Sequence, residues 1–151
     1  MKMRINDSLA RFAVGLLLLA ATVTGCAIGG QGTALGVQEE FESDTAGGTY
    51  RLTARSFAGE YRVGPAPERV EDARPAEIEA TATVNNEPGK LLLTFDAPEG
   101  ETPLVLELEG GETASGSGVG LVSGERVLVA LNAFKVGAGD VEIVVNFRYL
   151  E

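Results

Sequence analysis

Between residues 76 and 84, apolar and polar side chains alternate without a break, and this alternation recurs over much of the chain. Successive side chains of a strand point to opposite faces, so a period of two indicates strands with one buried face and one solvated face. Apolar residues also recur at every second position over 50–55, 91–95, 104–109 and 141–149, and no convincing long helical pattern interrupts them. The chain is therefore predicted to be all-β.

Residues rich in glycine, proline and asparagine separate these segments. The stretches 85–89 and 97–103 are predicted turns, and 64–74 and 110–120 are predicted to be longer loops. Strands at this spacing are typical of an antiparallel β-sandwich, and about 7–8 strands would suit an immunoglobulin-like one. A small β-barrel is the alternative architecture.

The first 26 residues follow a different pattern. Lys2, Arg4 and Arg11 precede the uncharged segment 12–24, which is shorter than the roughly 20 apolar residues needed to cross a bilayer core. The only cysteine of the chain follows at once, ending the sequence Val-Thr-Gly-Cys at Cys26. This arrangement resembles the lipobox signal of bacterial lipoprotein precursors.

The resemblance implies a lipid anchor and sets the domain boundaries. Residues 1–25 would be a removed signal peptide, and the Cys26 sulfur would carry a diacylglyceryl group, with a further acyl chain such as palmitate on its amine. Residues 26–36 would form the lipidated cysteine and a flexible glycine-rich tether, leaving 37–151 as a single β-domain. Ala27 stands where an aspartate often retains such proteins at the inner membrane. We therefore expect a cell-envelope location, at the outer membrane if the cell has two.

Composition excludes several classes of function. The net charge is −10, and it becomes −12 without the leader, which holds three basic residues and one acidic residue. Such a chain should repel nucleic acid. Histidine and tryptophan are absent, and no cysteine follows Cys26. Catalysis by Ser-His-Asp or Cys-His groups, and zinc sites with imidazole or thiolate ligands, are therefore excluded. We predict no enzyme activity, no cofactor and no metal.

Two pairs of glutamates are the first candidates for chemistry. Glu77 and Glu79, like Glu107 and Glu109, are two residues apart and so share a strand face. Glycosidases use two carboxylates about 5–9 Å apart. The alternation, however, assigns all four side chains to solvent, so we interpret them as exposed acidic strand faces.

Phosphate and calcium sites are the other candidates. The glycine-rich stretch 116–120 lacks both the G-x-x-x-x-G-K-[ST] and the G-x-G-x-x-G pattern, so we interpret it as a hairpin loop. Calcium binds clustered oxygen ligands, and such ligands could come from two turns. The candidate residues are Asp96, Glu99 and Glu101 in one turn and Asp140 and Glu142 in the other.

These observations favour a membrane-anchored lipoprotein whose non-catalytic β-domain is a binding or structural module in the cell envelope. Its partners would be the membrane, through the lipid on Cys26, and an envelope protein, but no nucleic acid. The loops 64–74 and 110–120 would face the partner, because binding residues are common on loops. The alternative is a carrier that holds a small apolar ligand within the sandwich or barrel core.

Overall fold

The computed structural model describes residues 32–64, 72–86 and 89–151. Cys26 and the rest of the leader lie outside this part of the chain. The described residues form strands and no helix, so none of their segments is a helix long and apolar enough to span a membrane. The strands are β1 (Thr33–Leu35), β2 (Gln38–Ser43), β3 (Gly47–Val63), β4 (Arg74–Asn86), β5 (Lys90–Phe95), β6 (Val105–Glu109), β7 (Thr113–Ser123), β8 (Arg126–Val127) and β9 (Val129–Tyr149).

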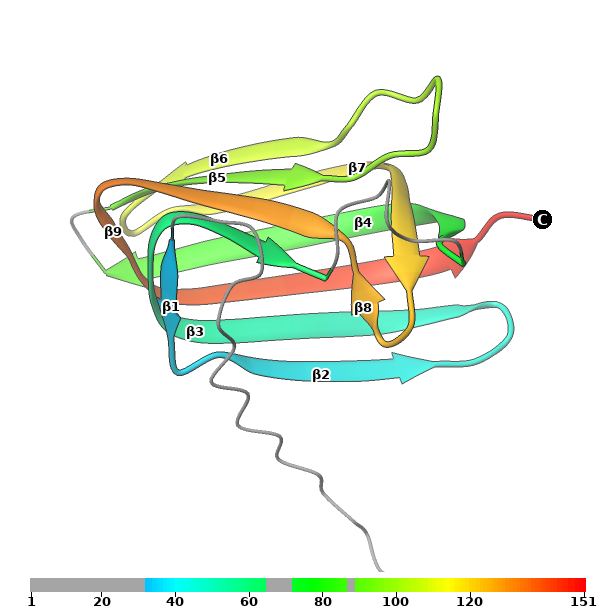
Figure 1. Ribbon diagram of the computed structural model, residues 1–151, viewed down its shortest axis with the longest axis horizontal. Helices are drawn as coiled ribbons and strands as arrows, with labels where there is room; N and C mark the ends of the chain where they lie inside the picture. Colours follow the sequence, from blue (N-terminus) through cyan, green and yellow to red (C-terminus); the bar gives the residue numbers. More distant parts are fainter. Residues whose placement is uncertain (1–31, 65–71, 87–88) are drawn as a thin grey trace, which may run out of the picture.

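Two long strands, β3 and β9, run through both layers of the molecule (Figure 1). They pair with each other in two stretches, residues 47–57 of β3 with 138–148 of β9, and residues 59–63 with 129–133. The register shifts between Phe57 and Gly59, and Gly59 has a φ of 75°, a conformation that glycine adopts without strain. This irregularity lets β3 bend from one layer into the other.

The other strands complete an antiparallel sandwich. One layer has the order β2-β3-β9-β4-β7, and the other has the order β1-β3-β9-β5-β6. The predicted all-β sandwich is therefore confirmed, with nine strands in the described residues. The strand order specifies it further: β4 and β7 lie in one layer and β5 and β6 in the other, around the central β3 and β9. This is the connectivity of a jelly roll.

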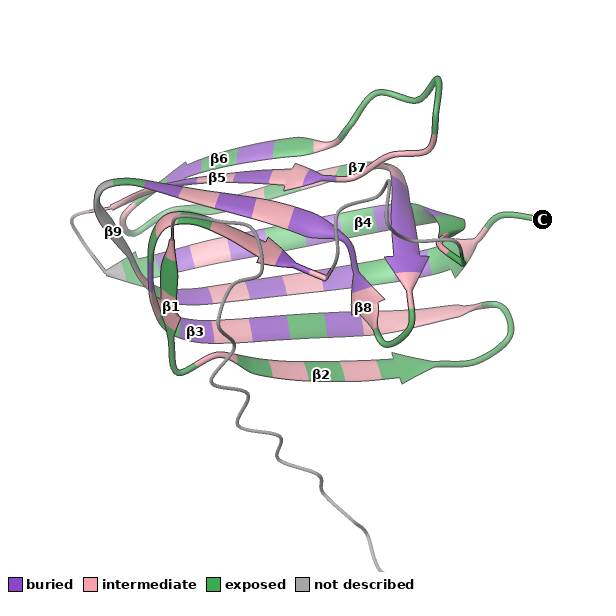
Figure 2. Cartoon of the chain, in the orientation of Figure 1, coloured by how far each residue is buried: buried purple, intermediate pink, exposed green. Residues whose placement is uncertain are grey.

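Alternation along the strands places the core between the two layers (Figure 2). Polar or charged residues are absent from the buried positions of the described chain, and the side chains that meet in the interior are apolar or aromatic. Burial of the predicted apolar faces of β4, β5 and β9 is confirmed. The buried residues are Ala76, Ile78, Ala80, Ala82, Val84, Leu91, Leu93, Phe95, Val141, Ile143, Val145 and Phe147.

The predicted loop at 110–120 is wrong, because most of it belongs to β7. Glycines occupy inward positions of this strand, and leucines of the opposite layer fill the space that side chains would take. A Cβ atom on Gly116 would lie 2.8 Å from Cδ1 of Leu104 and 3.0 Å from Cδ2 of Leu106. The small inward residues are thus a packing feature, and they hide the strand from an analysis of hydropathy.

The structure also bears on the other two irregular segments. Residues 33–35, at the end of the predicted tether, form β1 and pair with β3, and Ala34 packs against the core. Of the predicted loop 64–74, residues 65–71 lie outside the described chain.

Candidate functional site

The glutamate pairs predicted as candidates lie apart on the two layers. Glu77 and Glu79 are exposed on β4, whereas Glu107 and Glu109 are exposed on β6. Glu77 forms an ion pair with Arg148 of β9, and Glu107 forms one with Lys90 of β5. The two pairs are therefore not combined into one site, and one carboxylate of each pair balances a basic side chain on a neighbouring strand.

The residues predicted as calcium ligands are also not gathered into one site. Asp96 forms an ion pair with Arg62, and the backbone oxygen of Asp140 accepts a hydrogen bond from Nδ2 of Asn85 at 3.2 Å. The Glu142 carboxylate lies 3.6 Å from Nε of Arg51. Across residues 32–64, 72–86 and 89–151, no group of three or more acidic, histidine or cysteine side chains is placed to hold a metal ion.

The outer face of the layer containing β4 and β7 is polar, and its side chains pair with one another. Side-chain hydrogen bonds between neighbouring strands join Thr81 to Ser115 (3.0 Å), Thr83 to Thr113 (3.0 Å) and Thr49 to Asn146 (2.9 Å). Cross-strand hydroxyl pairs of this type stabilise a sheet modestly. The result is a surface of hydroxyl, amide and carboxylate groups rather than a site built around one reactive side chain.

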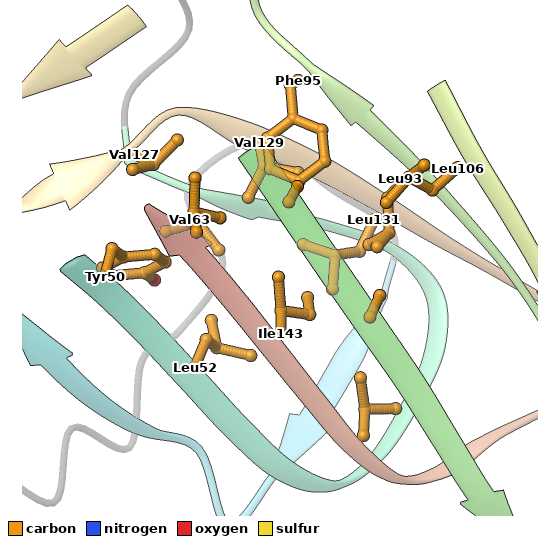
Figure 3. Packing of buried hydrophobic residues seen from close by; sticks show 14 of the residues in the cluster. Tyr50, Leu52, Val63, Leu93, Phe95, Leu106, Val127, Val129, Leu131 and Ile143 are labelled. Atoms are coloured by element: carbon orange, nitrogen blue, oxygen red, sulfur yellow. The ribbon is translucent and has the colours of Figure 1, made fainter. Parts of the chain in front are cut away.

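Sequence reasoning missed a cluster of polar groups at the side of the sandwich closed by β8. We call Glu39, Tyr50, Tyr61 and Arg126 the tyrosine cluster. Tyr50 is fully buried and belongs to the apolar cluster drawn in Figure 3, but its hydroxyl has no hydrogen-bond partner among the described residues. Burial raises the pKa of Tyr50 far above its usual value, and the negative charge of Glu39 raises it further. The pKa of Tyr61 is raised by the same two causes, burial first.

The charged members of the tyrosine cluster connect two strands that are distant in sequence. Nε of Arg126 donates to a carboxylate oxygen of Glu39 at 2.6 Å, and this hydrogen bond is the main reason why the pKa of Arg126 is raised. The pair joins the edge strand β2 to β8. Because both tyrosines stay protonated at neutral pH, they can form hydrogen bonds but are poor nucleophiles. The tyrosine cluster is therefore structural in character. Glu39 lies two residues before Phe41 on β2, so the two side chains point to the same face of the strand. This spacing is the sequence signal that could have revealed the tyrosine cluster.

Replacing Tyr50 with phenylalanine should stabilise the domain. The substitution removes a buried hydroxyl without a partner and keeps the ring, so we expect a gain of about 1 kcal/mol in the free energy of unfolding. Urea denaturation of the full-length chain in detergent measures this difference. Tyr61→Phe is the control, because the Tyr61 side chain is less buried and should respond less. A loss of stability in Tyr50→Phe would show that this hydroxyl does form a stabilising hydrogen bond.

Comparison with known proteins finds only distant structural likenesses. No protein-family model and no curated protein matches the sequence. The similar solved structures include a protein of the disulfide-linked endospore appendages of Bacillus, with 13% identity, 74% of this chain and 89% of that chain covered, and a TM-score of 0.45.

Two carbohydrate-binding modules are also similar in structure. The module of a Cellvibrio mixtus lichenase has 15% identity and a TM-score of 0.29, with 79% of this chain and 91% of that chain covered. The xylan-binding domain from Paenibacillus barcinonensis has 16% identity and a TM-score of 0.27, with 80% and 86% covered.

Proposed function

We propose that the chain is a membrane-anchored lipoprotein of the bacterial cell envelope, and that its β-domain is a non-catalytic binding or structural module. The observation that carries the proposal for the domain is the distribution of its polar groups. On the outer faces of the sandwich, hydroxyl, carboxylate and guanidinium side chains pair with one another, and apart from the Tyr50 hydroxyl the buried side chains of the described residues are apolar. Such a surface suits contact with a partner better than activation of a substrate.

The anchor would act by concentrating the domain at a membrane. The Val-Thr-Gly-Cys sequence ending at Cys26 supports lipidation there, and the first strand begins at Thr33. Six residues therefore separate the lipidated cysteine from β1, and a flexible segment of that length would have a root-mean-square reach of roughly 12–15 Å. The domain would then stay close to the membrane surface, where its effective concentration toward other envelope proteins is high.

Affinity capture from cells tests the binding role. The full-length chain with a C-terminal tag is crosslinked in the native cell, extracted with detergent and purified. We expect a specific envelope partner to be recovered with the wild-type chain and to be depleted with Cys26→Ser, which keeps the domain but lacks the lipid. Repeated captures that return the same background proteins from both chains would contradict the proposal.

A further inference from the structure

The edge strands of the sandwich differ in how they are protected. A free strand edge can pair with another chain, and proteins commonly block it with charged residues or proline. The edge strand β2 has three glutamates among six residues, and β6 has two among five. By contrast, β7 has eleven residues, TASGSGVGLVS, without a charge or a proline.

Among the described residues, one side of β7 has no strand partner along most of its length. In the described chain, β4 covers one side of β7 over residues 113–122, and β8 covers the other side only at Val122 and Ser123. The backbone oxygen of Leu121 also accepts a hydrogen bond from Leu128. The open edge therefore comprises residues 113–120.

Backbone geometry identifies the groups that face this open edge. The N–H and C=O of one strand residue point to the same side, and successive residues alternate. The oxygen of Glu112 bonds to Val84 of β4, whereas that of Leu121 bonds away from β4. Even-numbered residues therefore pair with β4, and Ser115, Ser117 and Val119 direct their N–H and C=O groups to the open edge.

The surroundings of this edge define what could pair with it. On the inner face, Leu104 is only partly buried and lies over Gly116 and Gly118, so it offers an apolar contact. On the outer face, Glu79 of β4 lies opposite Ser117 of β7. Glu112 precedes the strand and Glu125 follows it, both exposed. An incoming strand would meet apolar groups on one side and negative charge on the other.

We propose that the open edge of β7 is a strand-addition site for an extended protein segment in which apolar residues alternate with lysine or arginine. Backbone hydrogen bonds to Ser115, Ser117 and Val119 would supply affinity, and the alternating side chains would supply specificity. A second copy of this chain fits less well, because the carboxylates that surround each β7 edge, among them Glu79 and Glu112, would then face those of the other copy. The inference deepens the proposed binding role and rests on it.

A designed peptide tests the proposal with the full-length chain in detergent. The probe is a labelled, capped nine-residue peptide in which valine alternates with lysine and threonine, and its binding is measured by fluorescence anisotropy. Binding should weaken as salt is added, and hydrogen exchange should show that the amides of Ser115, Ser117 and Val119 become protected. Ser117→Pro should weaken binding about tenfold, since it removes an edge N–H donor. The fold should tolerate this change, because proline is accepted where the N–H of an edge strand faces outward.

Control variants separate strand addition from other effects. Ser117→Val keeps the N–H and should retain binding, whereas Glu79→Lys should weaken it by reversing a nearby charge. A peptide of the same composition with its lysines grouped together should bind poorly. Any one of three results would overturn the proposal. They are equal binding of the two peptides, an unchanged affinity in Ser117→Pro, and exclusion of the peptide by a dimer of this chain. If Ser117→Pro failed to fold, the exchange pattern of the wild-type complex would decide. Capture of an envelope partner from cells is measured separately, so failure of the β7 edge can be distinguished from failure of the proposed binding role.

Discussion

Replacing Phe95 with alanine is expected to lower the free energy of unfolding by about 3–5 kcal/mol. Phe95 lies at the end of β5, is fully buried and points into the core near Val129 and Leu93 (Figure 3). Its removal leaves a cavity that the strands on either side cannot readily close. Domains of this size are stable by only about 5–15 kcal/mol, so the loss is a large fraction of the total. No cysteine follows Cys26, so a disulfide within the β-domain cannot compensate.

Phe134→Ala provides a matched control for this loss. Phe134 lies on β9 in the same layer, paired with Lys90 of β5, and its side chain is 39% exposed. Urea denaturation of the two variants should give a loss for Phe134→Ala well below that for Phe95→Ala, because a half-exposed ring buries less area and leaves no closed cavity. Equal losses in the two variants would contradict the inward placement of Phe95.

Strands whose inward residues are large were predictable from the sequence. Ile78 and Val84 on β4 alternate with polar residues, Leu91 and Leu93 on β5 recur at the same period of two, and all four are buried. The local sequence determines which face of such a strand is buried, because a shift of one residue would expose all of its apolar side chains. The all-β class followed from the same alternation and from the turns between the strands, which favoured a sandwich and left a small barrel as the alternative.

The strand β7 was missed for a physical reason. Its inward positions include Gly116 and Gly118, which carry no apolar side chain, so the buried face has no hydropathy signal. The side chains that fill this space belong to Leu104 and Leu106, which lie on a different segment of the chain. A strand of this kind is recognisable only when the residues packed against it are known, and the proposed open edge was hidden for the same reason.

The tyrosine cluster depends on contacts that sequence proximity does not reveal. Glu39 and Arg126 are 87 positions apart, and the connection of β2 to β8 arises only after the layers have formed. The alternation correctly placed Tyr50 on a buried face, but it carries no information on whether a hydroxyl finds a partner there. The paired glutamates, in contrast, lie on exposed faces as expected.

Replacing Cys26 with serine is expected to have the largest effect on where the protein is found. With detergent phase separation, the wild-type chain should enter the detergent-rich phase and incorporate labelled palmitate, whereas Cys26→Ser should stay in the aqueous phase without label. Each buried CH₂ of an acyl chain contributes about 0.8 kcal/mol, and two or more chains anchor stably where one binds only with an association constant of about 10⁴ M⁻¹. Loss of all chains should therefore reduce membrane association by several orders of magnitude.

Ala27→Asp is the matched control for this experiment, because it changes the neighbouring residue and keeps the sulfur that would carry the lipid. This variant should stay in the detergent-rich phase and retain the label. An uncleaved leader in Cys26→Ser would complicate the result, so the mass of each purified chain is measured to show whether residues 1–25 have been removed. If processed Cys26→Ser enters the detergent-rich phase as completely as the wild-type chain, the anchor does not depend on this sulfur.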